Sequence, residues 1–499
     1  MNLKKTTLSL SLINAGSVFL GFLFHILLGR RFGISLELDC LFAGLAIFSL
    51  LGILNSFITS VFIPVFNEFK YKDEKGSFVF ADVTIKWVAL SALMMTSLAW
   101  VSGDSIVRVV ASGFKEESMS LTLDVIRILL IALIFSSITN IVGRILNALY
   151  FFAVPAITNF IHPVFNIAAL YLLSPLFGIK AVAISYVVSN SLQMCILFIY
   201  IMIKTPWRPT SRIYHEKMPS LIKHSSKMTL SGFIWSIREI ISRNIASHLA
   251  PGSIALLAYA EKFISIVLQI AVSPASKVFY SKVSELIAAN KWLDVRELFE
   301  RVSRANAVIV FFFSAGIIAF FVPLLNILFL GSKFTVHDIS TLFYLVLMLL
   351  TYLLILSYET YLVQIVYAEK KAHIVGINAV AGVIVFSLSA YLLTRKYGVY
   401  GIAASLIISQ LAVCCLYYIF INKQLKTSIV KFITHSARGL IISLLFIIAG
   451  ISVKPLLNND ILEILFVLPV WSFLFFMAVK VYMQKELEFI GIKDMFKHG

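Results

Sequence analysis

The sequence predicts an all-α, polytopic membrane protein. Of its 499 residues, 60% are hydrophobic and only 13% are charged, whereas soluble domains contain roughly 45 to 50% apolar and about 25% charged residues. The apolar residues come in repeated blocks of about 20, the length at which a helix crosses a roughly 30 Å hydrocarbon core. They do not alternate as the short strands of an outer-membrane barrel do. Composition and pattern therefore exclude a soluble enzyme and a porin.

Fourteen apolar segments are predicted to span the membrane as helices. Their approximate ranges are 8–28, 41–65, 83–102, 124–149, 153–174, 178–203, 225–249, 253–276, 305–330, 339–368, 372–394, 398–421, 434–453 and 460–480. The first six predict an N-terminal lobe at 1–203, and the next six predict a C-terminal lobe at 225–421. Residues 422–499 supply two additional helices and a tail. Two lobes around a central cavity are a frequent plan of transporters built from repeats.

Two polar segments interrupt the spans. Residues 204–224 contain three prolines and several basic residues, which indicates a linker between the lobes on the inner side. In residues 285–303, apolar and charged side chains alternate at near-helical spacing. This pattern predicts an amphipathic helix on the inner membrane surface.

The basic surplus is best explained by membrane topology. The chain has 42 Lys and Arg against 25 Asp and Glu, a formal net charge of +17. With the N-terminus inside, inner loops and tails hold about three times as many Lys and Arg as outer loops. The positive charge then faces anionic lipid, both termini are cytoplasmic, and no nucleic acid partner is expected. The four cysteines form no CxxC pair, so we expect neither a disulfide framework nor a metal site.

Charged residues inside the predicted spans are the candidate functional residues, because each costs about 2.5 to 3.5 kcal/mol at mid-membrane depth. Span 225–249 contains Arg238, Glu239 and Arg243. Glu239 and Arg243 are four residues apart, so they could form an internal ion pair and leave one snorkelling arginine. The alternative is that at least one of the arginines lines a cavity.

Span 253–276 holds the adjacent pair Glu261 and Lys262. Neighbouring side chains on a helix diverge by about 100°, so each residue needs a different partner or water. This favours an aqueous cavity over a buried structural network. Arg127 and Arg144 in span 124–149 fit a structural or a cavity role equally well.

The interior charges are net positive, which suits an anion such as phosphate or pyrophosphate. The residues expected to bind the substrate, at its pyrophosphate or at the rest of its head group, are Lys262, Arg243, Arg238, Arg144 and Glu261. The chain has no GxxxxGK[ST] loop, no HExxH and no acidic magnesium motif, so we expect neither enzymatic activity nor a cofactor. Transport would then be driven by the membrane potential or by a gradient of H⁺ or Na⁺.

A series of short motifs, in order along nearly the whole chain, resembles the MurJ (MviN) lipid II flippase branch of the multidrug/oligosaccharidyl-lipid/polysaccharide exporter superfamily. The motifs are Leu20-Gly21-Phe22, Phe62-Ile63-Pro64, Ala111-Ser112-Gly113-Phe114, Ile141-Val142-Gly143, Tyr259-Ala260-Glu261-Lys262-Phe263 and Lys333-Phe334-Thr335. The resemblance implies fourteen helices in a bacterial inner membrane and a lipid-linked saccharide as substrate. Membrane lipids and enzymes of polysaccharide or peptidoglycan synthesis are the partners that it suggests.

The chain also departs from the family it resembles. Arginines that the resemblance implies for the cavity fall on Val18, Phe24 and Gly52, and an arginine expected in the eighth span is Lys262. We therefore expect an undecaprenyl-pyrophosphate-linked exopolysaccharide or O-antigen unit, flipped by alternating access, with lipid II as the close alternative.

Gating or conformational roles are assigned to Arg30, Asp39, Glu239 and Glu359. Two other functions stay open at this point. One is a cation or drug antiporter like those of the MATE (multidrug and toxic compound extrusion) transporters, and the other is a transport-inactive relative that acts as a membrane scaffold.

Overall fold

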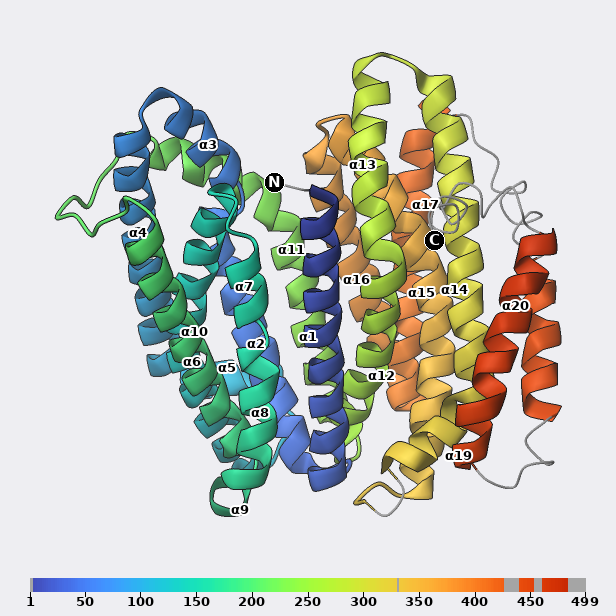
Figure 1. The fold of residues 1–499 in the computed structure, drawn as a ribbon. Helices are drawn as coiled ribbons and strands as arrows, with labels where there is room; N and C mark the ends of the chain where they lie inside the picture. The colour runs from blue at the N-terminus through green and yellow to red at the C-terminus, as the bar shows by residue number, and fades with distance from the viewer. Residues whose placement is uncertain (1–2, 330–331, 426–438, 453–459, 483–499) are drawn as a thin grey trace. The chain divides into compact units, whose positions relative to one another are not determined.

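The computed structural model describes residues 3–329, 332–425, 439–452 and 460–482 (Figure 1). Within these ranges, every regular element is a helix, which confirms the predicted all-α class. The chain divides into two compact units, Met1–Ala255 and Leu256–Gly499.

The first unit is built around α6. Its helices are α1 (Leu3–Phe32), α2 (Leu36–Thr59), α3 (Phe62–Lys72), α4 (Glu74–Val101), α5 (Gly103–Val110), α6 (Glu116–Ala148), α7 (Ala153–Thr158), α8 (Ile161–Leu172), α9 (Ser174–Phe177), α10 (Lys180–Lys204) and α11 (Met218–Ser247). Helices α2, α4 and α10 pack against α6. Gly44 permits the close approach of α2, because a Cβ atom there would lie 2.9 Å from Val125 Cγ1.

Helix α11 packs against α2 and belongs to the first unit. Ser60 and Thr229 share a hydrogen bond of 2.7 Å, and the Val61 amide donates to Ser225 Oγ at 3.2 Å. The boundary between the compact units therefore follows α11, whereas the sequence analysis places a linker before it, at 204–224. The arrangement of two six-helix repeats remains a prediction.

The second unit begins within α12 and contains the remaining helices. They are α12 (Ser253–Val267), a π-helical segment at Leu268–Val272, α13 (Ser273–Ala288), α14 (Trp292–Phe329), α15 (Val336–Ala368), α16 (Ala372–Tyr397), α17 (Val399–Leu425), α19 (Asp460–Leu462), a π-helical segment at Glu463–Val467 and α20 (Leu468–Tyr482). Helix α15 starts with a capping box in which Thr335 and Asp338 bond reciprocally to each other's backbone amides. This geometry explains why Asp338 follows the Lys333-Phe334-Thr335 motif at a distance of three residues.

Twelve helices in the described ranges are long and apolar enough to cross a membrane. The predicted span 225–249 lies in α11, where Arg238, Glu239 and Arg243 lower the hydropathy of the helix. The predicted span 434–453 lies partly outside the described residues, and its described part is a shorter apolar helix at Gly439–Ser452. The structure thus confirms a polytopic helical membrane fold, but it does not confirm the count of fourteen.

The predicted amphipathic helix at 285–303 does not form a separate element. Helix α13 ends at Ala288, a turn with Asn290 at φ 60° follows, and α14 runs without a break from Trp292. Part of the apolar face of this segment packs against α13, since the Phe279 and Phe299 rings lie 6.5 Å apart, whereas Leu293 is 82% exposed. The segment is therefore the first part of a long helix, and only part of its apolar face is covered by a neighbouring helix.

Candidate functional site

The charged residues of α11 are partly neutralised within the helix. Arg243 is only 4% exposed, and its guanidinium lies 3.4 Å from Glu239 Oε1. The internal ion pair that the sequence left open is therefore present. Arg238 lies over the ring of Trp235, with its Cζ atom 4.5 Å from the ring centroid. This is a cation–π contact within the same helix.

Two further cations in the predicted spans, Arg127 and Lys86, have local partners. The Arg127 guanidinium lies 5.7 Å from the centroid of the Trp100 ring. Lys86 is ion-paired with Asp82 at 2.7 Å and donates to the backbone of the segment between α10 and α11. Lys86 therefore fixes the backbone of this connecting segment and is not a candidate for substrate binding.

Arg144 and Lys262 differ from these cations. Each is half-buried, Arg144 on α6 and Lys262 on α12. Neither side chain makes an ion pair or a hydrogen bond to the part of the chain that the structure describes. A half-buried cation without an internal counter-ion can accept an anion of a ligand, because no protein carboxylate competes for it.

The five predicted head-group residues are distributed over both units. Arg144, Arg238 and Arg243 belong to the first unit, and Glu261 and Lys262 belong to the second. Among the predicted site residues, the structure brings Glu239 and Arg243 together in an ion pair.

Asp39 ties α2 to the start of α12. It is 2% exposed, and its Oδ2 and Oδ1 atoms accept hydrogen bonds from the Gly252 and Ala255 amides at 2.6 and 2.7 Å. A carboxylate at a helix N-terminus satisfies amides that have no partner in the helix. Gly252 has φ 89°, a left-handed conformation that glycine adopts without strain. The contact gives Asp39 a geometry suited to the conformational role predicted for it.

The Ala111–Phe114 motif docks on the end of α11, a contact that the sequence analysis did not predict. Asn244 Nδ2 donates to Val109 O and to Ser112 Oγ, both at 2.8 Å, and the Gly113 amide donates to Ser247 Oγ at 3.0 Å. A Cβ atom at Gly113 would lie 2.5 Å from Ser247 O, so only glycine fits. The glycine in the motif was the available signal of a close backbone approach.

Two other candidates lie apart from these contacts. Glu359 is buried on α15, where its Oε2 atom accepts a hydrogen bond of 2.9 Å from the buried Gln410 on α17. Arg30 is exposed in the last turn of α1, where a positive charge is favoured by the helix dipole.

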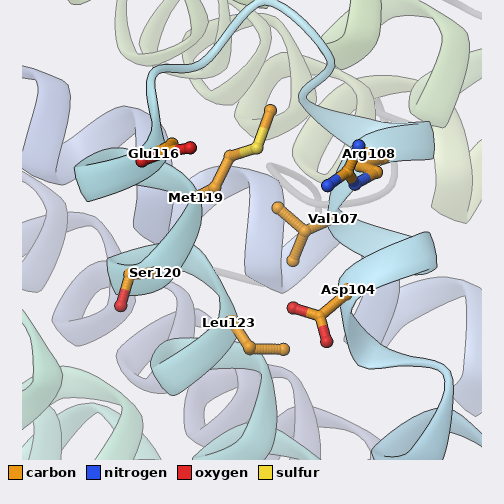
Figure 2. Close-up of a pocket in the computed structure, with 7 residues that line it drawn as sticks. All are labelled: Asp104, Val107, Arg108, Glu116, Met119, Ser120 and Leu123. Atoms are coloured by element: carbon orange, nitrogen blue, oxygen red, sulfur yellow. The ribbon is translucent and has the colours of Figure 1, made fainter.

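A pocket of about 240 Å³ lies between α5 and α6 (Figure 2). Asp104, Val107 and Arg108 come from α5, and they lie across from Glu116, Met119, Ser120 and Leu123 of α6. None of the predicted site residues lines it. Its mixture of one basic and two acidic groups does not favour an anionic ligand.

The positions that lack the implied arginines have different surroundings. Phe24 is 4% exposed and packs against His25, with a distance of 5.4 Å between the ring centroids. Gly52 on α2 has no atom within 4 Å of the place where a Cβ would stand. A Cβ atom thus meets no neighbour at Gly52, whereas Phe24 is already packed in the interior.

Comparison with known proteins identifies the family. A curated relative, "Probable lipid II flippase MurJ" of Rickettsia prowazekii (strain Madrid E), is 25% identical over 291 residues, which are 56% of each chain. The fold matches a solved structure of lipid II flippase MurJ in an inward closed conformation, with a TM-score of 0.79, 19% identity and coverage of 96% of this chain and 99% of that one. An inward-facing MATE family transporter of the MOP superfamily matches with a TM-score of 0.73, 14% identity and coverage of 82% and 94%.

The family match extends well beyond the region shared with this relative. It covers residues 29–469 of 499, and thus includes both compact units. Flippases are transporters, which agrees with the expectation that the chain is not an enzyme. The resemblance seen in the motifs is therefore confirmed, and the chain belongs to the lipid II flippase MurJ family.

Proposed function

We propose that the protein moves an undecaprenyl-pyrophosphate-linked saccharide from the cytoplasmic to the outer leaflet of a bacterial inner membrane by alternating access. Membership of the MurJ family supports transport of a lipid-linked precursor. The observation that carries the proposal is the pair of half-buried cations, Arg144 and Lys262, which have no counter-ion in the described ranges.

The proposed binding residues can be ranked by whether each already has a partner within the protein. Arg243 is already paired with Glu239, so its charge is partly neutralised before any substrate binds. Arg144 offers the planar, bidentate donors that match a phosphate, and Lys262 offers a compact charge. We therefore place Arg144 and Lys262 nearest to the pyrophosphate. Arg238 and Arg243 then act as secondary contacts, and Glu261 contacts the saccharide.

The conformational cycle would involve Asp39. Its two hydrogen bonds hold the start of α12, the helix that carries Lys262, against α2. Any movement that separates α12 from α2 has to break these hydrogen bonds, so Asp39 acts as a closing contact. Energy would come from the membrane potential or from a gradient of H⁺ or Na⁺, and both termini would be cytoplasmic.

The saccharide is the open part of the proposal. The missing arginines at Val18, Phe24 and Gly52 favour an exopolysaccharide or O-antigen unit, whereas the names of the relatives favour lipid II. A biosynthetic enzyme for either glycan would be the natural supplier of the substrate.

The test is native mass spectrometry of the purified protein with added lipid-linked saccharides, followed by a flipping assay in vesicles. We expect Arg144→Gln and Lys262→Gln to lose binding of the pyrophosphate lipid. Arg127→Gln is the matched control, because it removes an intramembrane arginine that has an aromatic partner. Binding of ordinary phospholipid alone by the wild-type protein would contradict the proposal and favour an antiporter or an inactive scaffold.

A further inference from the structure

The connection between α10 and α11, residues 205–217, is fastened to α4. Asp82 is 2% exposed, and its Oδ2 atom accepts hydrogen bonds from the amide and the hydroxyl of Thr210 at 3.0 and 2.7 Å. Lys86 donates to the carbonyl oxygens of Thr210 and Arg212. Trp87 Nε1 donates to the Ile213 carbonyl at 2.9 Å. A flexible linker would not need a buried carboxylate to hold its backbone, so this connection has a defined place.

That place is the border of the apolar part of the first unit. No charged residue follows Lys86 in α4, and none lies between Lys180 and Lys204 in α10. Lysine and tryptophan are typical of the membrane–water interface, where one end of the side chain is apolar and the other is hydrated. In Figure 1 the green loop that follows α10 extends sideways from the helices of this unit, beside α4.

The tip of this loop is apolar and exposed. Ile213 and Tyr214 are 69% and 65% exposed, although the Ile213 carbonyl is held by Trp87. The cations Lys204, Arg208 and Arg212 lie near them in the chain and are also exposed. Arg208 uses Nη1 to cap the end of α10, which leaves its other donors available. Exposed apolar side chains beside cations form the pattern by which proteins bind an anionic membrane surface.

We infer that residues 208–214 form an interfacial anchor that binds anionic phospholipid. Ile213 and Tyr214 enter the boundary between head groups and acyl chains, and Arg212, assisted by Arg208, holds the phosphate. This role is separate from the proposed transport site, because none of these residues belongs to it. The anchor fixes the height of α4 in the bilayer, since Asp82 connects the loop rigidly to that helix.

The depth of the loop can be measured by spin labelling in lipid nanodiscs. Cys40, Cys195, Cys414 and Cys415 are first replaced by alanine, and a label is attached to Tyr214→Cys or to Tyr71→Cys. Tyr71 is the matched control, because it is an exposed tyrosine, 96% exposed, on α3. We expect the label at 214 to be more accessible to oxygen than to a water-soluble nickel chelate, and the label at 71 to show the reverse. Equal access of the chelate to both positions would overturn the inference.

The preference for anionic lipid is tested on the full-length protein by native mass spectrometry. The protein is equilibrated with equal amounts of phosphatidylglycerol and phosphatidylcholine. Wild type should retain mainly phosphatidylglycerol, Arg212→Gln should lose much of that preference, and Lys75→Gln, which removes an exposed charge elsewhere, should keep it. An unchanged preference in Arg212→Gln, or an equal loss in Lys75→Gln, would overturn the assignment of the anionic ligand.

Discussion

At the scale of single residues, the partners of a buried charge decide its role. Arg238, Arg243 and Lys262 look equivalent in the sequence, since all are cations in apolar segments. The structure separates them: Arg243 is ion-paired with Glu239, Arg238 stacks on Trp235, and Lys262 has no counter-ion in the described ranges. A nearby ion-pair or aromatic partner lowers the free-energy cost of placing a charge in a membrane. A cation without such a partner is available to bind an anionic substrate.

Gly52 gives a prediction about substrate choice at this scale. We expect Gly52→Arg to fold, because a Cβ atom at this position meets no atom within 4 Å and glycine is a poor helix former by about 1 kcal/mol. It restores a cation where the family resemblance implies one. We expect this variant to bind lipid II more tightly relative to an exopolysaccharide precursor, as measured by native mass spectrometry.

Gly52→Gln controls for the size of the new side chain, since it adds a similar length without charge. If both variants changed lipid preference equally, or if neither did, the positive charge at this position would have no part in choosing the saccharide.

At the scale of the elements, polar contacts at helix ends hold segments that are distant in sequence. Asp39 joins α2 to α12, Asn244 joins α11 to the Ala111–Phe114 motif, and Asp82 joins α4 to the loop after α10. The Asp39 contact satisfies amides at the start of α12, which the helix leaves without partners, whereas the Asp82 contact holds the backbone of a loop.

Asp39→Ala should loosen the start of α12. It leaves the Gly252 and Ala255 amides without their acceptor, and loss of a helix cap costs about 1 kcal/mol, more when the amides stay buried. Hydrogen exchange of residues 252–256 should become faster, and thermal stability should fall.

Asp39→Asn is the milder variant, because the asparagine side chain retains one acceptor oxygen. The backbone amides of residues 252–256 should then lose less protection than in Asp39→Ala. Unchanged exchange in the alanine variant would show that water or another group replaces the carboxylate, and the closing role of Asp39 would fail.

The loop after α10 should respond to pH through His215. Its ring lies 5.1 Å from Phe69 and 5.2 Å from Phe80, and its Nδ1 atom accepts from the Lys217 amide at 3.2 Å. Burial lowers the pKa of His215 below its usual 6.5. Lys217 and Arg212 also lower this pKa, and Glu216 and Asp73 oppose the shift. The folded loop thus prefers the neutral ring.

This preference sets the direction of the pH effect. The stabilisation is complete above the unfolded-state pKa, near 6.5, and declines as the pH falls through that value towards the lower pKa of the folded loop. Hydrogen exchange of residues 208–217, corrected for intrinsic rates, should therefore reveal weaker protection in mild acid than at neutral pH. His215→Gln should lose this difference, and a difference that persisted in that variant would assign the effect to another group.

At the scale of the whole molecule, the fold consists of two compact helical units, each with its own packing. The first is organised around α6, and the second combines α14 to α17 with α20. In the second, Trp471 of α20 packs its ring 5.4 Å from Phe320 of α14 and donates to the Phe446 carbonyl at 2.7 Å. The candidate cations are divided between the units, with Arg144 in one and Lys262 in the other.

The sequence by itself determined the all-α membrane class, the positions of most spans and the family, because these follow from hydropathy and from local motifs. Tertiary structure decided what the charges do. The ion pair between Glu239 and Arg243 depends on the side-chain conformations in the folded helix. From the sequence, this ion pair and a cavity-lining arginine were both possible.

Other contacts could not be foreseen at all. Some hydrogen bonds join residues more than 100 positions apart. Asp39 accepts from the Gly252 and Ala255 amides, and Asp82 accepts from Thr210. The same limit explains the continuous α14, where the amphipathic pattern did not say whether a membrane surface or another helix would cover its apolar face. Local sequence patterns indicate which apolar faces and polar groups of a segment have to be buried. Which other segment covers them is decided by tertiary packing.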